Sequence, residues 1–313
     1  MDFFSSEVQA SRNQEIIDPI LKEAEVSLFI KREDQIHDYV SGNKFRKLKY
    51  NLIEAQKLGF ETILTFGGAY SNHIAATAAA GKIVGLQTIG VIRGEELAKD
   101  LNHTLSENDT LRFATDNRMK LKFVSRANYK EKASESFLEE LKKEFGSFYC
   151  IPEGGTNVLA VKGCEEILTT RDEIFDYICC AVGTGGTISG IINASVGHQN
   201  IIGFPALKGS FLSEEIEKYT RKTNWNLIEE YHFGGYGKIN LELIEFINKF
   251  REEQNIALDP IYTGKMMYGL FDRIKNGAFT KNTRILAVHT GGLQGIAGMN
   301  KKLEKKEFPL IMI

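Results

Sequence analysis

The sequence predicts an α/β fold built around parallel β-sheet. Short runs rich in β-branched and aromatic residues alternate with helical stretches over most of the 313 residues, which is the pattern of strand–helix–strand units. This length allows a large buried core and favours two domains or one large α/β unit. Hydrophobic residues make up 42% of the chain and charged residues 26%, as in ordinary globular proteins.

The individual strands and helices are predicted from these patterns in turn. The candidate strands are residues 27–30, 62–66, 87–92, 120–124, 148–151, 177–182, 201–204, 226–233 and 284–289. The helical stretches include residues 47–58, 74–83, 130–144, 241–251 and 267–275. Phe45, Leu48 and Leu52 recur on one face, which indicates that the first helix packs inward. Residues 95–118 are polar and weakly periodic, and we expect them to form a mobile loop or lid.

Composition and charge argue against several classes of binding partner. A net charge of −2 gives no electrostatic reason to expect nucleic acid or an anionic membrane, and the basic run 44–49 is typical of a solvated helix face. No apolar run approaches the roughly 20 residues that span a bilayer, and residues 1–7 lack the features of a signal peptide. The cysteines show no metal-ligand spacing, and buried reduced thiols are expected at Cys179 and Cys180. We therefore expect a cytoplasmic protein without a metal site.

A glycine-rich segment, Gly183-Thr184-Gly185-Gly186-Thr187, follows a predicted strand and precedes a helical run. Glycines let the backbone approach an anion closely, and amides at a helix start attract phosphate. The segment lacks the last glycine of a dinucleotide fingerprint and the Gly-Lys-Ser/Thr of a Walker loop. From this segment alone, a cradle for one phosphate group and a tight turn made for packing both stay open.

A second polar segment, residues 67–73, also joins a predicted strand to a helix. Ser71 or Asn72 is expected to cap that helix. Three hydrogen-bonding side chains in sequence, Ser71, Asn72 and His73, exceed what one cap requires, and amides at a helix start suit a carboxylate ligand. For His73 alone, a structural role is the stronger interpretation.

Lys44 stands at a predicted helix start, in Ser41-Gly42-Asn43-Lys44. A lysine at such a place is ordinarily a surface charge. Here Asn43 and Ser41 supply hydrogen bonds near the amine, and the positive potential of a helix start lowers the pKa of that amine. A neutral amine is the nucleophile that covalent attachment to an aldehyde requires.

Three later residues are further candidates. Tyr236 lies in a glycine-flanked turn and Tyr262 in Asp-Pro-Ile-Tyr-Thr-Gly-Lys, from which a ring can stack on a flat ligand. For either tyrosine alone, a place in the core is the preferred interpretation. Thr290 follows a predicted strand, where open α/β sheets bind ligands.

With these motifs in order, the chain resembles the pyridoxal-phosphate enzymes of fold type II, which are tryptophan synthase β-subunit-like. More narrowly, it is similar to the family of 1-aminocyclopropane-1-carboxylate deaminases and D-cysteine desulfhydrases. The most specific segments are residues 41–48, 71–73 and 259–265. The resemblance implies two open twisted-sheet α/β domains with pyridoxal 5'-phosphate in the cleft between them. Residues 1–46 and 150–313 would form the large domain and residues 47–149 the small one, in a homodimer.

The resemblance also implies roles for single residues. Lys44 matches the lysine that bonds covalently to the cofactor. The implied catalytic residues are Lys44, Ser71, Tyr236 and Tyr262. The implied cofactor ligands are Lys44, Asn72, Gly183, Thr184, Gly185, Gly186, Thr187, Tyr262 and Thr290. The implied substrate ligands are Ser71, Asn72 and His73.

This chain departs from the family pattern at Ser41 and Tyr70, where glycine and glutamine are usual, and both changes bear on the substrate pocket. After Tyr262, deaminase-like members carry glutamate and desulfhydrase-like members carry threonine, as here at Thr263. A carboxylate near the pyridine nitrogen keeps it protonated and strengthens electron withdrawal, whereas a hydroxyl does not. Opening a cyclopropane needs the stronger withdrawal, and expelling thiolate or chloride needs less.

We therefore expect a lyase that eliminates the β-substituent of D-cysteine or another β-substituted D-alanine, giving pyruvate, ammonia and sulfide or another leaving group. Deamination of 1-aminocyclopropane-1-carboxylate to 2-oxobutanoate and ammonia is the alternative within the family. A nucleotide-binding oxidoreductase that uses the 183–187 segment is a second alternative, disfavoured by the incomplete fingerprint. A non-catalytic member that binds the cofactor or an amino acid is a third.

Overall fold

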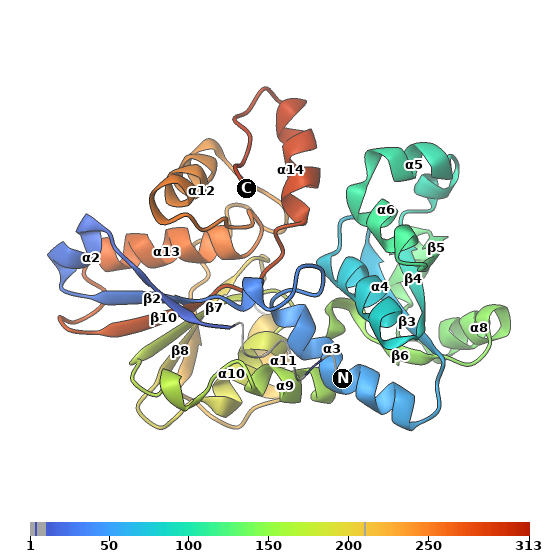
Figure 1. Ribbon diagram of the computed structural model, residues 1–313, viewed down its shortest axis with the longest axis horizontal. Helices are drawn as coiled ribbons and strands as arrows, with labels where there is room; N and C mark the ends of the chain where they lie inside the picture. The colour runs from blue at the N-terminus through green and yellow to red at the C-terminus, as the bar shows by residue number, and fades with distance from the viewer. Residues whose placement is uncertain (1–3, 5–10, 210) are drawn as a thin grey trace.

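Two separate β-sheets organise the protein (Figure 1). The computed structural model describes residue 4 and residues 11–209 and 211–313. Except for Phe4, the N-terminal residues whose composition argued against a signal peptide lie outside the described residues. The larger sheet has the strand order β1-β2-β10-β7-β8-β9, and the smaller has the order β5-β4-β3-β6.

The strands are parallel within both sheets, except that β1 pairs antiparallel with β2. The larger sheet contains β1 (Asn13–Ile16), β2 (Ser27–Lys31), β7 (Tyr177–Val182), β8 (Asn200–Pro205), β9 (Trp225–Leu227) and β10 (Arg284–Val288). The smaller contains β3 (Thr62–Gly68), β4 (Gln87–Arg93), β5 (Lys120–Val124) and β6 (Tyr149–Ile151). The α/β prediction is confirmed. Strand β1 was not predicted, because Ile16 is its one apolar residue.

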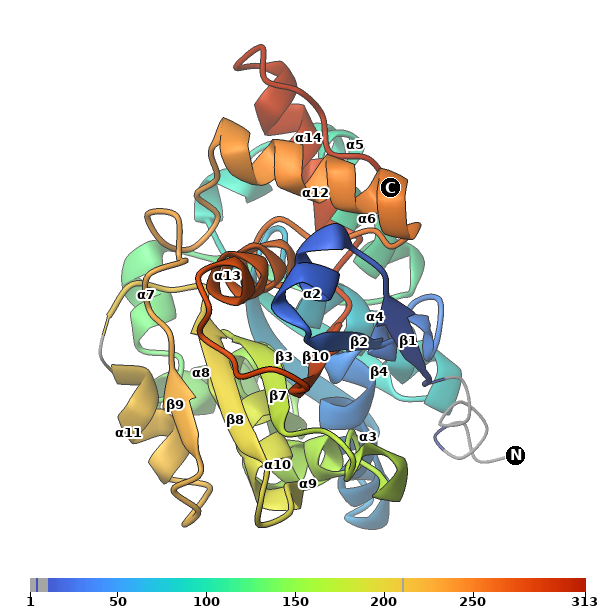
Figure 2. The same cartoon turned by 90° about the vertical axis from the view of Figure 1, so that its left-hand side faces the viewer.

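Helices cover both faces of the larger sheet, and its strands alternate between two cores (Figure 2). In β7, Cys179 and Ala181 face one core, whereas Ile178, Cys180 and Val182 face the other, as the two-residue period of a strand requires. The first core is closed by α2 (Pro19–Ala24), α12 (Leu241–Gln254), α13 (Thr263–Lys275) and α14 (Gly295–Glu304). The second is closed by α9 (Val158–Glu165), α10 (Gly186–Ala194) and α11 (Phe211–Glu217).

The smaller sheet is covered in the same way. One face packs against α3 (Asn43–Lys57) and α4 (Asn72–Val84), and the other against α7 (Arg126–Lys130) and α8 (Glu135–Phe145). The buried alanines of α4 keep that helix close to its neighbours. Beside α4 lie α5 (Leu101–Glu107) and α6 (Asp109–Asp116).

Three predicted elements were wrong in part. The expected loop at 95–118 is mostly helical, because Asp100 and Asn108 cap α5 and α6 and Leu111 is buried in a core with α4. The expected strand 226–233 ends at Leu227, and the segment after it bends where Phe233 adopts φ 53°. The expected helix 130–144 begins later, at Glu135, because α7 ends at Lys130 and Ser134 caps the start of α8.

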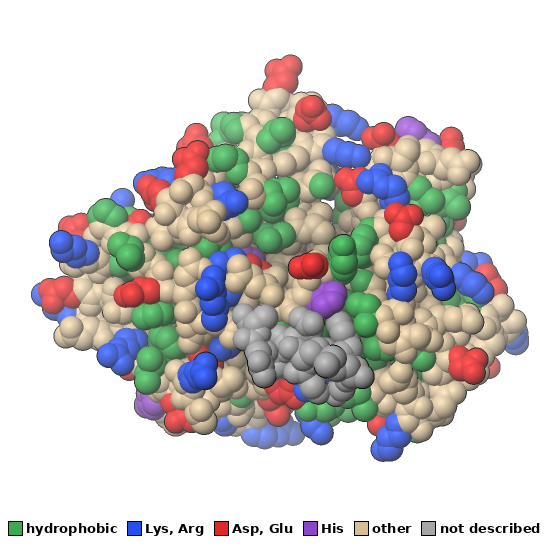
Figure 3. Space-filling model, viewed as in Figure 1, with side chains coloured by type: hydrophobic (Ala, Val, Ile, Leu, Met, Phe, Trp, Pro, Cys, Tyr) green, Lys and Arg blue, Asp and Glu red, His purple; other side chains and the backbone are tan. Residues whose placement is uncertain are grey.

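The structure also tests the predictions about membrane spans, surface charge and cysteines. Among the described residues, no helix has both the length and the apolar character needed to cross a membrane. Acidic and basic side chains are interspersed on the face shown in Figure 3. All four cysteines are free thiols, and the predicted burial of Cys179 and Cys180 is confirmed. The expected solvated face at 44–49 is wrong, because Arg46 and Lys47 are only 1% and 2% exposed.

Candidate active site

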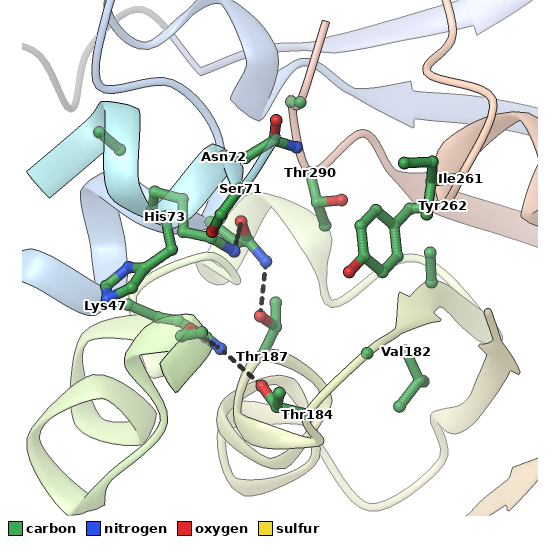
Figure 4. A pocket seen from close by; sticks show the side chains of 18 of the residues that line it. Lys47, Ser71, Asn72, His73, Val182, Thr184, Thr187, Ile261, Tyr262 and Thr290 are labelled. Carbon is green, nitrogen blue, oxygen red and sulfur yellow. Dashed lines mark hydrogen bonds between the residues drawn. The ribbon is translucent and has the colours of Figure 1, made fainter. Parts of the chain in front are cut away.

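One pocket opens where the carboxyl ends of β3, β7 and β10 approach each other between the two sheets. It encloses about 870 Å³, including space open to solvent, which is room for a cofactor and a small ligand. Of the residues proposed from the sequence, all but Gly186 line it: Lys44, Ser71, Asn72, His73, Gly183, Thr184, Gly185, Thr187, Tyr236, Tyr262 and Thr290. Figure 4 shows several of these side chains converging on the pocket from different elements.

Lys44 is the second residue of α3 and belongs to a short hydrogen-bonded chain. Its Nζ donates to Asn43 Oδ1 at 3.0 Å, and Asn43 Nδ2 donates to Thr187 Oγ1 at 2.9 Å. Burial, together with the neighbouring positive charge of Lys47, lowers the pKa of Lys44 to about 7. A substantial fraction of this amine is therefore neutral and nucleophilic at neutral pH.

The start of α3 is fixed by Gly42, which adopts φ 60° and ψ −142°. A Cβ at this position would lie 1.9 Å from the carbonyl oxygen of Thr290, so only glycine fits. The next amide, of Asn43, donates to that same carbonyl at 3.2 Å. This close approach holds Lys44 beside the end of β10.

The segment after β3 provides a helix cap, Ser71, and a side chain with an unused hydrogen-bond acceptor, Asn72. Ser71 caps α4, and its Oγ accepts from the Ile74 amide at 3.4 Å. Asn72 Oδ1 is buried and has no hydrogen-bond partner within the described chain. A buried polar atom of this kind is costly unless a ligand or water satisfies it. The predicted cap is confirmed, and Asn72 is left available to a ligand.

His73 is buried behind the same segment. Its Nε2 lies 2.8 Å from Thr65 Oγ1, and its Nδ1 has no partner among the described residues. Burial, followed by the charge of Lys44, lowers the pKa of His73 well below its usual value. His73 is therefore neutral, in keeping with the structural role preferred from the sequence.

The glycine-rich segment joins β7 to α10, with Gly185 at φ 83° as the residue before the helix. Gly186 serves packing, since a Cβ there would lie 2.8 Å from Thr156 Cγ2. Thr184 and Thr187 point their hydroxyls toward the pocket (Figure 4). The backbone amides at this helix start suit an anion.

Lys47 is a functional candidate that the sequence analysis missed. Its Nζ donates to the carbonyl of Gly154 at 3.0 Å, to Thr156 Oγ1 at 2.9 Å and to Thr184 Oγ1 at 3.4 Å. Burial lowers the pKa of Lys47, and in its protonated form this buried amine beside the glycine-rich segment adds positive charge to the anion cradle. The available signal was its spacing, because residues three apart on a helix lie on one side and Lys44 faces the pocket.

Tyr262 and Tyr236 meet at the rim of the pocket, with ring centroids 6.2 Å apart at an interplanar angle of 64°. Tyr236 is 50% exposed. Burial raises the pKa of Tyr262 well above its usual value, so its hydroxyl stays protonated. It is suited to donate a hydrogen bond and not to act as a base.

Thr263, the residue that distinguishes desulfhydrase-like from deaminase-like members, does not line the pocket. Thr263 is fully buried, and its Oγ1 donates to Asp259 Oδ2 at 2.6 Å. The carboxylate of Asp259 also accepts from the amides of Tyr262 and Thr263, both at 2.8 Å, and so fixes the start of α13. The threonine hydroxyl near the end of β10 that does line the pocket is that of Thr290, and no carboxylate is among the described lining residues.

Comparison with known proteins shows the family of the chain. Residues 15–291 match the family described as pyridoxal-phosphate dependent enzyme. A bifunctional D-cysteine desulfhydrase/1-aminocyclopropane-1-carboxylate deaminase from Arabidopsis thaliana is 33% identical over 86% of this chain and 73% of its own. A D-cysteine desulfhydrase from Klebsiella pneumoniae is 28% identical over 85% of this chain and 86% of its own. A crystal structure of an ACC deaminase homologue superposes with a TM-score of 0.76 at 30% identity, covering 94% of this chain and 93% of the other.

Proposed function

Because the chain belongs to the family of pyridoxal-phosphate dependent enzymes, we propose that it is a lyase that removes the β-substituent of a small amino acid. D-cysteine or another β-substituted D-alanine is the proposed substrate, and pyruvate, ammonia and sulfide or another leaving group are the products. The family membership is incompatible with the nucleotide-binding oxidoreductase. The observation that carries the proposal is the position of the Lys44 amine, which shares one pocket with an anion cradle and is linked to it through Asn43.

The lining residues fit pyridoxal phosphate. Lys44 supplies an amine for its aldehyde, and the segment from Gly183 to Thr187, with Lys47 behind it, suits its phosphate. The amide of Asn72 has hydrogen-bonding capacity that the described protein leaves unused. When bound, the cofactor withdraws electrons from the carbon that bears the substrate amine, which makes the proton on that carbon acidic.

The protein's own groups then have separate tasks. Lys44 Nζ, with its pKa lowered to about 7, accepts the proton from that carbon. Ser71 and Asn72, at the start of α4, bind the substrate carboxylate. Tyr262 donates a hydrogen bond from a hydroxyl that stays protonated.

Elimination is favoured over cyclopropane opening by the lining of the pocket. The hydroxyl of Thr290 faces the pocket and no described lining residue is acidic, so the protein supplies no carboxylate to strengthen electron withdrawal. Expulsion of thiolate requires less electron withdrawal than opening of the cyclopropane ring. Relatives named for both activities keep the deaminase as the second candidate.

Product analysis separates these candidates. The purified holoenzyme is incubated with D-cysteine and, separately, with 1-aminocyclopropane-1-carboxylate, and pyruvate and 2-oxobutanoate are measured. We expect pyruvate and sulfide from D-cysteine, lost in Lys44→Ala. Formation of 2-oxobutanoate alone would establish the deaminase, and inertness toward every small amino acid would favour the non-catalytic binding protein.

We also propose the domain division 1–46 with 150–313 and 47–149, together with a cytoplasmic homodimer. The division is supported by the two sheets, although α3 and β6 run across its limits and pack with the smaller sheet. Free cysteines are in keeping with a reducing compartment. Light scattering of the purified protein tests the dimer, which a monomer mass would contradict.

A further inference from the structure

Lys265 is a buried lysine to which the proposed reaction gives no task. It lies in the first turn of α13 and is 2% exposed. Its Nζ donates to the carbonyl oxygens of His232 at 2.9 Å and Gly235 at 2.8 Å. Within the described chain, no carboxylate lies within salt-bridge distance of this ammonium. Its hydrogen bonds therefore go to one loop.

That loop carries Tyr236 to the rim of the pocket. Its backbone is unusual, because Phe233, Gly234, Gly235 and Gly237 all have positive φ values. A segment with this many left-handed residues is held poorly by local preferences alone. Within the described chain, its backbone-to-backbone hydrogen bonds are short-range turns such as Gly235 N to His232 O, at 3.0 Å. At its start, the Tyr231 hydroxyl donates to Asp272 Oδ2 on α13 at 2.7 Å. The two bonds from Lys265 tie the part of the loop next to Tyr236 to the same helix.

The same helix start also carries the other tyrosine of the rim. Tyr262 precedes α13 and Lys265 follows three residues later, so both project from one turn. The rings of Tyr236 and Tyr262 are in edge contact, at 6.2 Å between centroids. Burial lowers the pKa of Lys265 to about 8, which leaves the ammonium largely charged at neutral pH. Charged donors make the stronger hydrogen bonds to carbonyl groups.

We propose that Lys265 is a positioning residue that fixes the 231–238 loop and so holds Tyr236 against Tyr262 at the pocket. The two tyrosines are thereby set by a single turn of α13. The effect of Lys265 on catalysis rests on the proposed function. Its effect on the loop does not.

Hydrogen exchange tests the loop directly in the purified holoenzyme. In Lys265→Met, we expect amides of the peptide 231–238 to exchange at least about tenfold faster than in the wild type, because charge-assisted bonds are lost. Lys275→Met is the matched control, since this exposed lysine ends the same helix, and it should leave the peptide unchanged. Equal exchange in Lys265→Met and the wild type would overturn the proposal. Should Lys265→Met fail to fold, Lys265→Gln serves in its place.

A double-mutant cycle tests whether Lys265 acts through Tyr236. We expect Lys265→Met to lower kcat more than it raises KM, and to add little further loss in a Tyr236→Phe background. Losses that multiply would show that Lys265 acts elsewhere and would refute the positioning role. A wild type without lyase activity would remove the proposed function, yet the exchange experiment would still decide whether Lys265 holds the loop.

Discussion

The Nζ of Lys44 lies 3.0 Å from the Oδ1 of Asn43, whose amide nitrogen in turn donates to Thr187 Oγ1 at 2.9 Å. One asparagine thus joins the proposed covalent anchor to the proposed phosphate cradle. Both amide atoms are engaged, so the orientation of the amine depends on the position of the α10 start.

Replacement of Asn43 by alanine removes both bonds. We expect Asn43→Ala to weaken the affinity for pyridoxal phosphate by about tenfold, the effect of losing about 1.4 kcal/mol of hydrogen bonding. Titration of the cofactor-free protein, followed by absorbance, measures this. Asn276→Ala, an exposed asparagine after α13, is the control. An unchanged affinity in Asn43→Ala would show that the hydrogen-bonded chain has no part in holding the cofactor.

Gly42 and Gly59 make a matched pair. Both have positive φ, but a Cβ at Gly42 would lie 1.9 Å from Thr290 O, whereas nothing lies within 4 Å of a Cβ at Gly59. Gly59→Ala should therefore cost only about 1 kcal/mol of backbone strain. Gly42→Ala should cost more and should also abolish cofactor loading, because the start of α3 must move. Urea unfolding and absorbance measure the two effects, and equal behaviour of the two variants would contradict this.

The amine of Lys44 should titrate near neutrality. Its pKa is lowered to about 7, so the neutral form predominates above that pH and the ammonium below it. In cofactor-free protein with isotope-labelled lysine, we expect an NMR resonance that titrates near pH 7 and disappears in Lys44→Met. The rate of cofactor attachment should fall as the pH is lowered through this range. A Lys44 resonance that titrates only near the ordinary lysine value would disprove the assigned environment.

A buried ion pair stabilises the helix that carries Lys44. Arg46 Nε and Nη2 donate to the carboxylate of Glu33 at 2.8 and 3.0 Å, and both side chains are buried. Glu33→Ala leaves the guanidinium without this partner and should cost about 3–5 kcal/mol in the free energy of unfolding. Glu144→Ala breaks an exposed pair with Lys122 and should cost less than about 1 kcal/mol. Comparable costs in urea unfolding would refute this ranking.

Much of the fold was accessible from the sequence because its parallel strands are covered on both faces. Such strands are short, nearly continuous apolar runs, as in β7, and the predicted bounds of that strand match the structure. Strand β1 was not predicted because it is a polar edge strand. Helices α5 and α6 were not predicted because they are short and depend on caps and on contact with α4.

The site was predicted where glycines and polar residues break the periodicity at strand ends. Lys47 was missed because it lies in a basic run that was interpreted as a solvated helix face, although its three-residue spacing from Lys44 places it on the same side of the helix. The position of the Thr263 hydroxyl was missed for a different reason. Its partner, Asp259, is also the residue that fixes the start of α13, and sequence proximity does not show which hydroxyl faces a pocket.

The most direct test of the account is to identify the lysine that carries the cofactor. Purified protein loaded with pyridoxal phosphate is reduced with borohydride, which makes the lysine–cofactor bond permanent, and is then digested and mapped by mass spectrometry. The account predicts a pyridoxyl group on the peptide that contains Lys44. A label on Lys47, on Lys265 or on no lysine at all would contradict it.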